Sequence, residues 1–224
     1  MNKKEKAALK AAEYIKDNMV LGLGTGSTAY YLIQKVGELV GKGYNLKCVA
    51  TSESTLKIAR DLNIPLFSPD EVDHIDLAID GVDEIDLAFN AIKGGGGALL
   101  REKIVASLSK KVIWIMDDSK LVSTIGKFPL PVEIIRYGYK QLLKKLEALG
   151  FNPVLRLNHG EAFLTDNGNY IVDLHLGEGF NILKTKEILD GLVGVVESGL
   201  FLNLCDLIIV GSDQEARVII NKNK

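Results

Sequence analysis

Four consecutive glycines, residues 94–97, stand between Lys93 and Glu102. Because glycine carries no side chain, the N–H groups of such a run can approach an anionic or oxyanionic ligand without steric obstruction. A cation, an unobstructed backbone and a carboxylate in one short segment are the groups that proton transfer on a polar substrate requires. The segment therefore predicts an acid–base site. The structural alternative is a flexible glycine hinge before an ordinary surface helix.

A helix is predicted to begin at Ala98, directly after these glycines, and Glu102 falls about one turn into it. Its expected apolar side, flanked by Val105, repeats every four residues and consists of Leu100, Ile104 and Leu108. The glycines would then lead into a helix N-terminus, where unpaired N–H groups and the macrodipole favour negative charge.

Two further carboxylates, Asp80 and Asp83, follow an apolar stretch whose alternation with period two predicts a strand. They flank Gly81 and Val82 at the expected carboxyl end of that strand, where open α/β sheets place their ligands. Asp-Gly is also a common plain turn, so the motif has a structural interpretation as well. Only nine residues separate Asp83 from Lys93, which favours a shared site.

A second glycine-rich loop, residues 22–28, follows a short apolar strand and precedes another predicted helix. Strand, glycine loop and helix in this order are typical of a phosphate-binding unit. The loop lacks the lysine of a Walker A motif and the third glycine of the dinucleotide fingerprint. It offers N–H groups and hydroxyls that suit a phosphate monoester or sugar oxygens, at Thr25, Gly26, Ser27 and Thr28. Helix capping by Ser27 or Thr28 is the structural alternative.

The order of predicted elements is that of an α/β protein with a Rossmann-like parallel sheet and a smaller ferredoxin-like α+β subdomain. Strand ends near residues 22, 80, 92 and 116 carry polar or glycine-rich loops, which predicts one ligand site along the carboxyl edge of a parallel sheet. We expect a catalytic Rossmann-like domain of residues 1–127 plus 201–224. Residues 128–200 are expected to form the ferredoxin-like subdomain.

Composition excludes several classes of function. The net charge of -2 gives no electrostatic footprint for nucleic acid, and the polar N-terminus predicts neither a secretory signal nor a membrane span. The two cysteines, Cys48 and Cys205, lie far apart in apolar surroundings, so we expect buried side chains and no disulfide. The three histidines lack metal-ligand spacing, and no metal is expected. The composition, the polar N-terminus and the unpaired cysteines together predict a cytoplasmic protein.

Taken together, these motifs resemble the ribose-5-phosphate isomerase type A family. The resemblance extends over essentially the whole chain, and its segments follow the family's order at residues 24–28, 80–84, 93–103, 121–133 and 165–169. Val82 stands where the family usually has alanine, and Gly97 is an additional glycine. Neither departure changes a functional group.

The resemblance implies an aldose–ketose isomerase that interconverts D-ribose 5-phosphate and D-ribulose 5-phosphate through an enediolate. It implies the non-oxidative pentose phosphate pathway, no cofactor or metal, and a homodimer or dimer of dimers. The family's general base falls on Glu102, its carboxylates for ring opening and hydroxyl protons on Asp80 and Asp83, and its cationic partner on Lys93. The implied substrate-binding residues are Thr25, Gly26, Ser27, Thr28, Asp80, Gly81, Val82, Asp83, Lys93, Gly94, Gly95, Gly96 and Lys120. Lys4 aligns loosely with a family lysine near the phosphate.

Two other interpretations stay open at this point. The loop at residues 21–27 is similar to the first glycine loop of methyltransferases, but that function leaves Asp80, Lys93 and Glu102 without a role. A sugar-phosphate sensor would use similar loops, yet such modules usually accompany a DNA-binding segment. No helix-turn-helix fits before residue 18.

Overall fold

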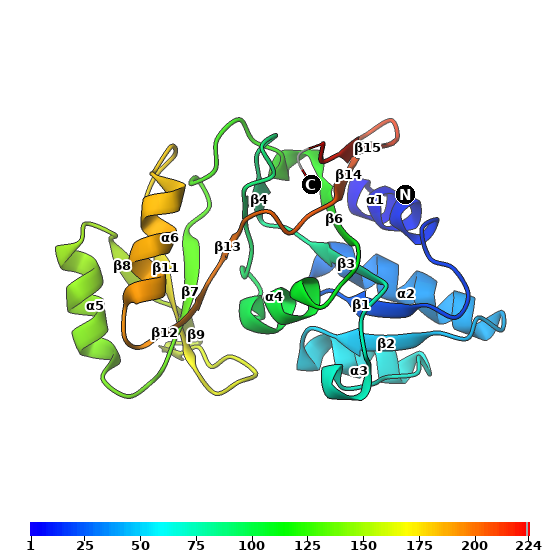
Figure 1. Ribbon diagram of the computed structural model, residues 1–224, viewed down its shortest axis with the longest axis horizontal. Coiled ribbons are helices and arrows are strands. Elements are labelled where there is room, and N and C mark those ends of the chain that lie inside the picture. The colour runs from blue at the N-terminus through cyan, green and yellow to red at the C-terminus, as the bar shows by residue number, and fades with distance from the viewer. Residues whose placement is uncertain (223) are drawn as a thin grey trace. The chain divides into compact units, whose positions relative to one another are not determined.

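The computed structural model describes residues 1–222 and 224 (Figure 1). The described chain divides into two compact units. The first unit is formed by Met1–Val82, Arg101–Leu121 and Asn203–Lys224, and the second by Asp83–Leu100 and Val122–Leu202. This division differs from the expected domains chiefly in assigning residues 83–100 to the second unit. The domain boundaries therefore stay a prediction.

A six-stranded sheet forms the centre of the first unit, with the order β15-β14-β6-β3-β1-β2. Its strands are β1 (Val20–Leu23), β2 (Lys47–Ala50), β3 (Leu77–Gly81), β6 (Val112–Asp117), β14 (Leu207–Gly211) and β15 (Ala216–Ile220). All neighbours pair in parallel except β14 and β15. The Rossmann-like parallel sheet is therefore confirmed. Since β2 and β3 lie on opposite sides of β1, the chain reverses its direction of winding between β1 and β3, where such sheets bind ligands.

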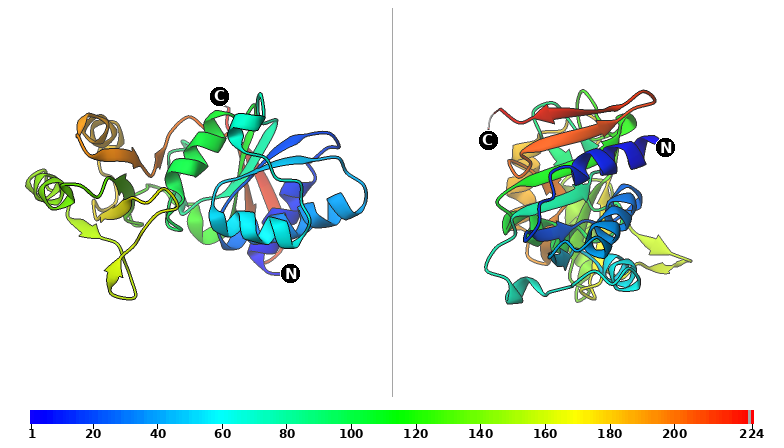
Figure 2. Two further views of the ribbon diagram at one scale, coloured as in Figure 1. Left: turned by 90° about the horizontal axis from the view of Figure 1, so that it is seen from below. Right: turned by 90° about the vertical axis from the view of Figure 1, so that its right-hand side faces the viewer.

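Helices cover both faces of this sheet. Three of them pack on one face around a shared hydrophobic core, and they are α1 (Lys3–Ala12), α2 (Ser27–Gly41) and α3 (Glu53–Asp61) (Figure 2). The fourth helix, α4 (Leu99–Ser107), lies on the opposite face. A Cβ atom at Gly22 would lie 2.5 Å from Val105 Cγ1, so glycine at this position lets α4 approach the sheet closely. Two 3₁₀ turns, η1 (Pro69–Glu71) and η2 (Asp118–Lys120), complete the helical elements of this unit.

The predicted apolar side of α4 is wrong. Ile104 and Leu108 are each 42% exposed, whereas the buried side consists of Leu99, Glu102, Val105 and Ala106. The reason is that the close packing of Val105 on the sheet fixes the rotation of the helix. Glu102 precedes Val105 by about one turn and is therefore buried with it, at 5% exposure.

The second unit contains an antiparallel four-stranded sheet with the order β12-β7-β11-β8. Its elements along the chain are β7 (Leu130–Ile134), α5 (Tyr139–Ala148), β8 (Pro153–Leu155), β11 (Tyr170–Leu174), α6 (Ile182–Gly191) and β12 (Val195–Ser198). A short hairpin of β9 (Leu157–Asn158) and β10 (Glu161–Ala162) follows β8. Both helices share a hydrophobic core with the sheet. This βαββαβ arrangement confirms the ferredoxin-like subdomain.

A separate three-stranded sheet of the second unit corrects one further expectation. It consists of β4 (Glu84–Ile85), β5 (Ala91–Ile92) and β13 (Leu200–Phe201), all antiparallel. The strand that ends at Ile92 therefore does not belong to the parallel sheet, because it pairs with β4 and β13 instead. The other three strand ends, near residues 22, 80 and 116, do lie in that sheet.

Both cysteines of the first unit have the environment expected from the sequence. Cys48 and Cys205 are free and buried, and burial raises the pKa of each thiol to about 12. None of the described helices is both long enough and apolar enough to cross a membrane.

Candidate active site

The carboxylate of Asp80, at the end of β3, is bound by the glycine loop that follows β1. The backbone N–H groups of Thr25 and Gly81 donate to Asp80 Oδ1 at 2.9 and 2.6 Å. A Cβ atom at Gly24 would lie 2.5 Å from Asp80 Cα, so only glycine permits this approach. Asp80 is 6% exposed. Gly81 continues β3 and does not form the plain turn that Asp-Gly suggested.

The three hydroxyls of the loop have different environments, which the sequence did not distinguish. Thr25 Oγ1 lies 2.7 Å from the hydroxyls of both Thr51 and Ser52, so this side chain holds the loop to the start of α3. Thr28 is buried at 8% exposure. Ser27 Oγ accepts a hydrogen bond of 2.9 Å from Lys4 Nζ.

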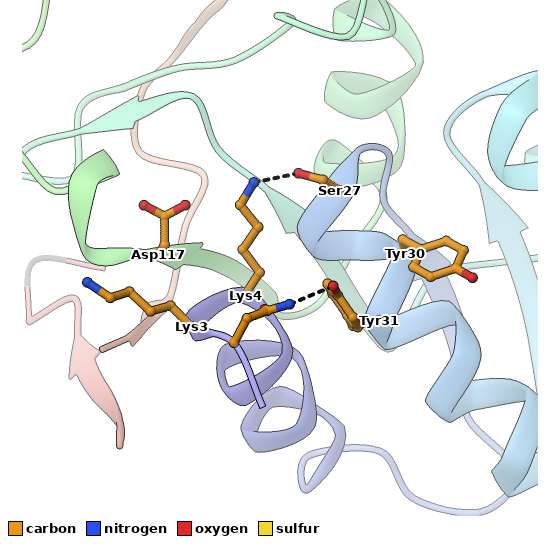
Figure 3. Close-up of a pocket in the computed structure, with 7 residues that line it drawn as sticks. Lys3, Lys4, Ser27, Tyr30, Tyr31 and Asp117 are labelled. Carbon is orange, nitrogen blue, oxygen red and sulfur yellow. Dashed lines mark hydrogen bonds between the residues drawn. The ribbon is translucent and has the colours of Figure 1, made fainter. Parts of the chain in front are cut away.

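A cavity of about 640 Å³ opens beside Ser27 in the first unit (Figure 3). It is lined by Asn2, Lys3, Lys4, Ser27, Tyr30, Tyr31 and Asp117. The residue before α2 is Gly26, which has a φ of 104° and makes no side-chain cap. The first-turn N–H groups of α2, Ser27 and Lys4 together suit an anion such as a phosphate.

Positive charge in this region also acts on Asp117, the last residue of β6. Burial alone would raise its pKa, but hydrogen bonds from Ser119 and the charges of Lys120 and Lys4 hold the pKa below its ordinary value. Lys120 is thus close enough to interact electrostatically with the same carboxylate as Lys4. The predicted ligand site already included the strand end near residue 116, which carries Asp117. No pattern in the sequence indicated Asn2, Tyr30 or Tyr31, because the start of α1 meets α2 and β6 only through tertiary packing.

Glu102 and Asp80 lie on the same face of the parallel sheet. Gly22, whose Cβ position would contact Val105, also lies against Ala78, and Asp80 follows Ala78 by one strand period. The end of α4 lies at the amino edge of the sheet, since the N–H of Ile75 donates to the carbonyl of Leu108. Glu102, in the first turn of α4, is therefore directed toward the carboxyl edge.

The second unit holds the remaining predicted groups. The N–H of Gly95 donates to Asp83 Oδ2 at 2.7 Å, and a Cβ at Gly95 would lie 2.6 Å from Asp83 Oδ1. The loop closes as a turn in which the N–H of Gly97 donates to the carbonyl of Gly94. Lys93 is 2% exposed, and its Nζ lies 5.3 Å from the centre of the Phe201 ring. The prediction that the glycines lead directly into a helix is confirmed, because α4 begins at Leu99.

The predicted site residues are therefore distributed over both units. The first unit carries Thr25, Gly26, Ser27, Thr28, Asp80, Gly81, Val82, Glu102 and Lys120, and the second carries Asp83, Lys93, Gly94, Gly95 and Gly96. Among the residues that the structure describes, no group of three or more His, Cys, Asp or Glu side chains could hold a metal ion.

The fold is that of an α/β protein that combines a parallel sheet with a ferredoxin-like unit. At the switch point of the parallel sheet, a glycine loop that suits an anion lies beside a carboxylate. The family model described as ribose 5-phosphate isomerase A (phosphoriboisomerase A) matches residues 47–215. Ribose-5-phosphate isomerase A of Streptococcus pneumoniae is 47% identical over 222 residues, covering 99% of this chain and 98% of that protein. The chain belongs to this family.

Solved structures agree with this assignment. The ribose 5-phosphate isomerase of Plasmodium falciparum is 37% identical and has a TM-score of 0.93, with 98% of each chain covered. A D-ribose-5-phosphate isomerase solved in complex with phospho-erythronic acid is 36% identical, also with a TM-score of 0.93, and covers 98% of this chain and 100% of that one.

The close approach of the glycine loop to β3 predicts the effect of adding one methyl group. We expect Gly24→Ala to lower the free energy of unfolding by about 1–3 kcal/mol, because the new Cβ overlaps the backbone of Asp80. The matched control is Gly41→Ala at the end of α2, where a Cβ meets no atom within 4 Å. It is expected to be neutral or to stabilise by up to about 1 kcal/mol. Urea unfolding measures both, and equal stabilities would contradict the packing described for Gly24.

Proposed function

We propose that this protein interconverts D-ribose 5-phosphate and D-ribulose 5-phosphate. The observation that carries the proposal is its full-length similarity to ribose-5-phosphate isomerase A proteins. The complex of one such relative with phospho-erythronic acid supports an enediolate route. This four-carbon acid has a planar carboxylate that resembles the enediolate of the sugar, and enzymes bind such mimics tightly.

Glu102 is proposed as the general base. Isomerisation moves a proton between two adjacent carbons, and one carboxylate can remove the proton from the first carbon and return it to the second. Burial of Glu102 on the inner side of α4 supports this role, because water would otherwise exchange with the transferred proton.

The negative charge that develops on the enediolate requires donors that are already in place. We assign this role to Lys93 and to the N–H groups of Gly94 and Gly96, since preorganised donors stabilise an oxyanion at no cost of reorganisation. The N–H of Gly95 instead donates to Asp83 and holds that carboxylate beside the loop. The carboxylates of Asp80 and Asp83 are proposed to handle the hydroxyl protons during ring opening and proton transfer. The reaction moves a proton and no hydride, so we propose that it requires neither a redox cofactor nor a metal.

The phosphate group is proposed to bind in the cavity beside Ser27. Lys4 Nζ, 2.9 Å from Ser27 Oγ, supplies a positive charge, and the start of α2 supplies N–H groups. Thr25, Gly26 and Thr28 shape this loop, and Lys120 adds a further positive charge near Asp117. Gly81 and Val82 are proposed to contact the sugar. Phosphate binding then positions the sugar without taking part in the chemistry.

Replacement of the proposed base tests the reaction. We expect the wild-type protein to isomerise ribose 5-phosphate equally well with and without EDTA. Glu102→Gln should lower kcat by about 10²–10⁴-fold while KM stays within a few-fold, because the amide retains the shape but cannot accept a proton. The control is Glu38→Gln, which removes an exposed carboxylate on α2. Ordinary turnover by Glu102→Gln would contradict the role of Glu102, and a loss of activity with EDTA would contradict the metal-free mechanism.

Replacement of Lys4 separates binding from chemistry. Lys4→Met should raise KM for ribose 5-phosphate about 10–100-fold, since a charge-assisted hydrogen bond is lost, and should leave kcat within a few-fold. The exposed Lys16→Met serves as the control for loss of one positive charge. An unchanged KM would show that the phosphate binds elsewhere.

We also propose a homodimer or dimer of dimers and a cytoplasmic location. Support for association comes from exposed apolar side chains on and after the edge strand β8, where Val154, Leu157 and Leu164 are each more than half exposed. Two free buried thiols fit a reducing compartment. Light scattering of the purified protein should give twice or four times the 24.5 kDa chain mass, and a monomer would contradict the first proposal. Cell fractionation tests the second.

A further inference from the structure

We infer that Arg156 is a positioning residue that fixes the orientation of the peptide groups in the glycine loop of residues 94–97. Its Nη1 donates to the carbonyl oxygens of Gly94 and Gly95, at 3.0 and 3.1 Å. These are two consecutive peptide groups of the segment that we propose to stabilise the enediolate. The inference therefore rests on the proposed function and deepens it.

The orientation of the two carbonyls determines where the donors point. In a trans peptide group the N–H is directed opposite to the carbonyl, and the described chain has no cis peptide bond. Holding the carbonyls of Gly94 and Gly95 toward Arg156 thus directs the N–H groups of Gly95 and Gly96 to the opposite side of the loop. The N–H of Gly95 donates to Asp83 Oδ2 at 2.7 Å on that side. The guanidinium and the proposed catalytic carboxylate consequently lie on opposite sides of the loop.

Arg156 is itself held in a fixed position. Its Nε and Nη2 donate to the two carboxylate oxygens of Asp173 at 2.9 and 2.5 Å, and both side chains are largely buried. Its guanidinium lies 5.9 Å from the centre of the Phe163 ring, and a Cβ at Gly97 would lie 2.5 Å from that same ring. A planar, bidentate ion pair has little freedom to rotate, so it can fix the groups to which it donates.

The strands of the second unit supply this support. Arg156 immediately follows β8, and its backbone N–H donates to the carbonyl of Ile171 in β11 at 2.8 Å. Asp173 lies two residues further along β11 and therefore on the same face of the sheet as Ile171. The ion pair is thus built on two hydrogen-bonded strands.

A glycine loop needs such support more than any other segment. Glycine has the greatest conformational freedom of all residues, so a run of four can rotate its peptide groups at little cost. A rotated peptide group would present a carbonyl in place of an N–H to the enediolate. Since oxyanion donors act only when they are preorganised, catalysis depends on preventing that rotation.

Variants of Arg156 test the inference through two independent readouts. We expect Arg156→Gln to increase hydrogen exchange of the amides of residues 94–97 at least about tenfold. We expect kcat to fall by about 10²–10³-fold, and the Kd of phospho-erythronic acid to rise correspondingly, because its planar carboxylate needs the same donors. KM for ribose 5-phosphate should stay within about threefold, since phosphate binding is assigned to the first unit. Arg136→Gln, at an exposed position of the same unit, is the control.

Arg156→Lys keeps the charge and much of the packing, and therefore serves where the glutamine variant does not fold. It should also be impaired, because an ammonium cannot hold two carbonyls and a carboxylate in one plane. Unchanged loop exchange, or full activity of the lysine variant, would overturn the inference. Wild-type protein without turnover would instead contradict the proposed function, and the exchange measurement would still decide whether Arg156 fixes the loop.

Discussion

The hydrogen bond that the backbone N–H of Thr25, in the glycine loop, donates to Asp80 is the constraint on which the rest of the first unit depends. It connects the ends of β1 and β3 at the point where the winding of the sheet reverses. The loop can come this close only because Gly24 has no side chain. The position of the loop fixes the start of α2. Ser27, at the start of α2, and Lys4 both line the cavity described above. A buried carboxylate thus orients the loop that we assign to phosphate binding.

In the second unit, a positively charged side chain orients the glycine loop. This glycine loop also approaches a carboxylate, Asp83, through the N–H of Gly95. Its orientation is fixed on the opposite side by Arg156, which donates to the carbonyl of Gly94. The first unit uses backbone donors to fix an anion, whereas the second uses a cationic side chain to fix backbone carbonyls. In both cases the glycines provide access and a neighbouring charged group provides order. This division of roles explains why glycine-rich segments can serve as rigid binding surfaces.

Local patterns in the sequence were sufficient to predict the strands of the parallel sheet and the ferredoxin-like unit. They failed where tertiary packing decided the outcome. The apolar spacing of Ile104 and Leu108 suggested a buried side, but the fit of Val105 against Gly22 rotated α4 and buried Glu102 instead. The strand before Lys93, β5, was expected in the parallel sheet, but it pairs with β4 and β13 in another sheet. Arg156 left no signal at all, since one arginine after a strand has no spacing that connects it to a glycine loop.

The two units are interleaved along the chain, with crossings after Val82, Leu100, Leu121 and Leu202. Neither unit is therefore a continuous segment, and no single truncation yields either of them whole. Within each unit, the contacts join chain segments that are distant in sequence. The chain is therefore expected to fold more slowly than a protein of similar size whose contacts are local. The crossings also fall beside Asp83, Glu102 and Lys120. A circularly permuted or split form cut at a crossing would thus place its new chain ends next to residues that we assign to the candidate site.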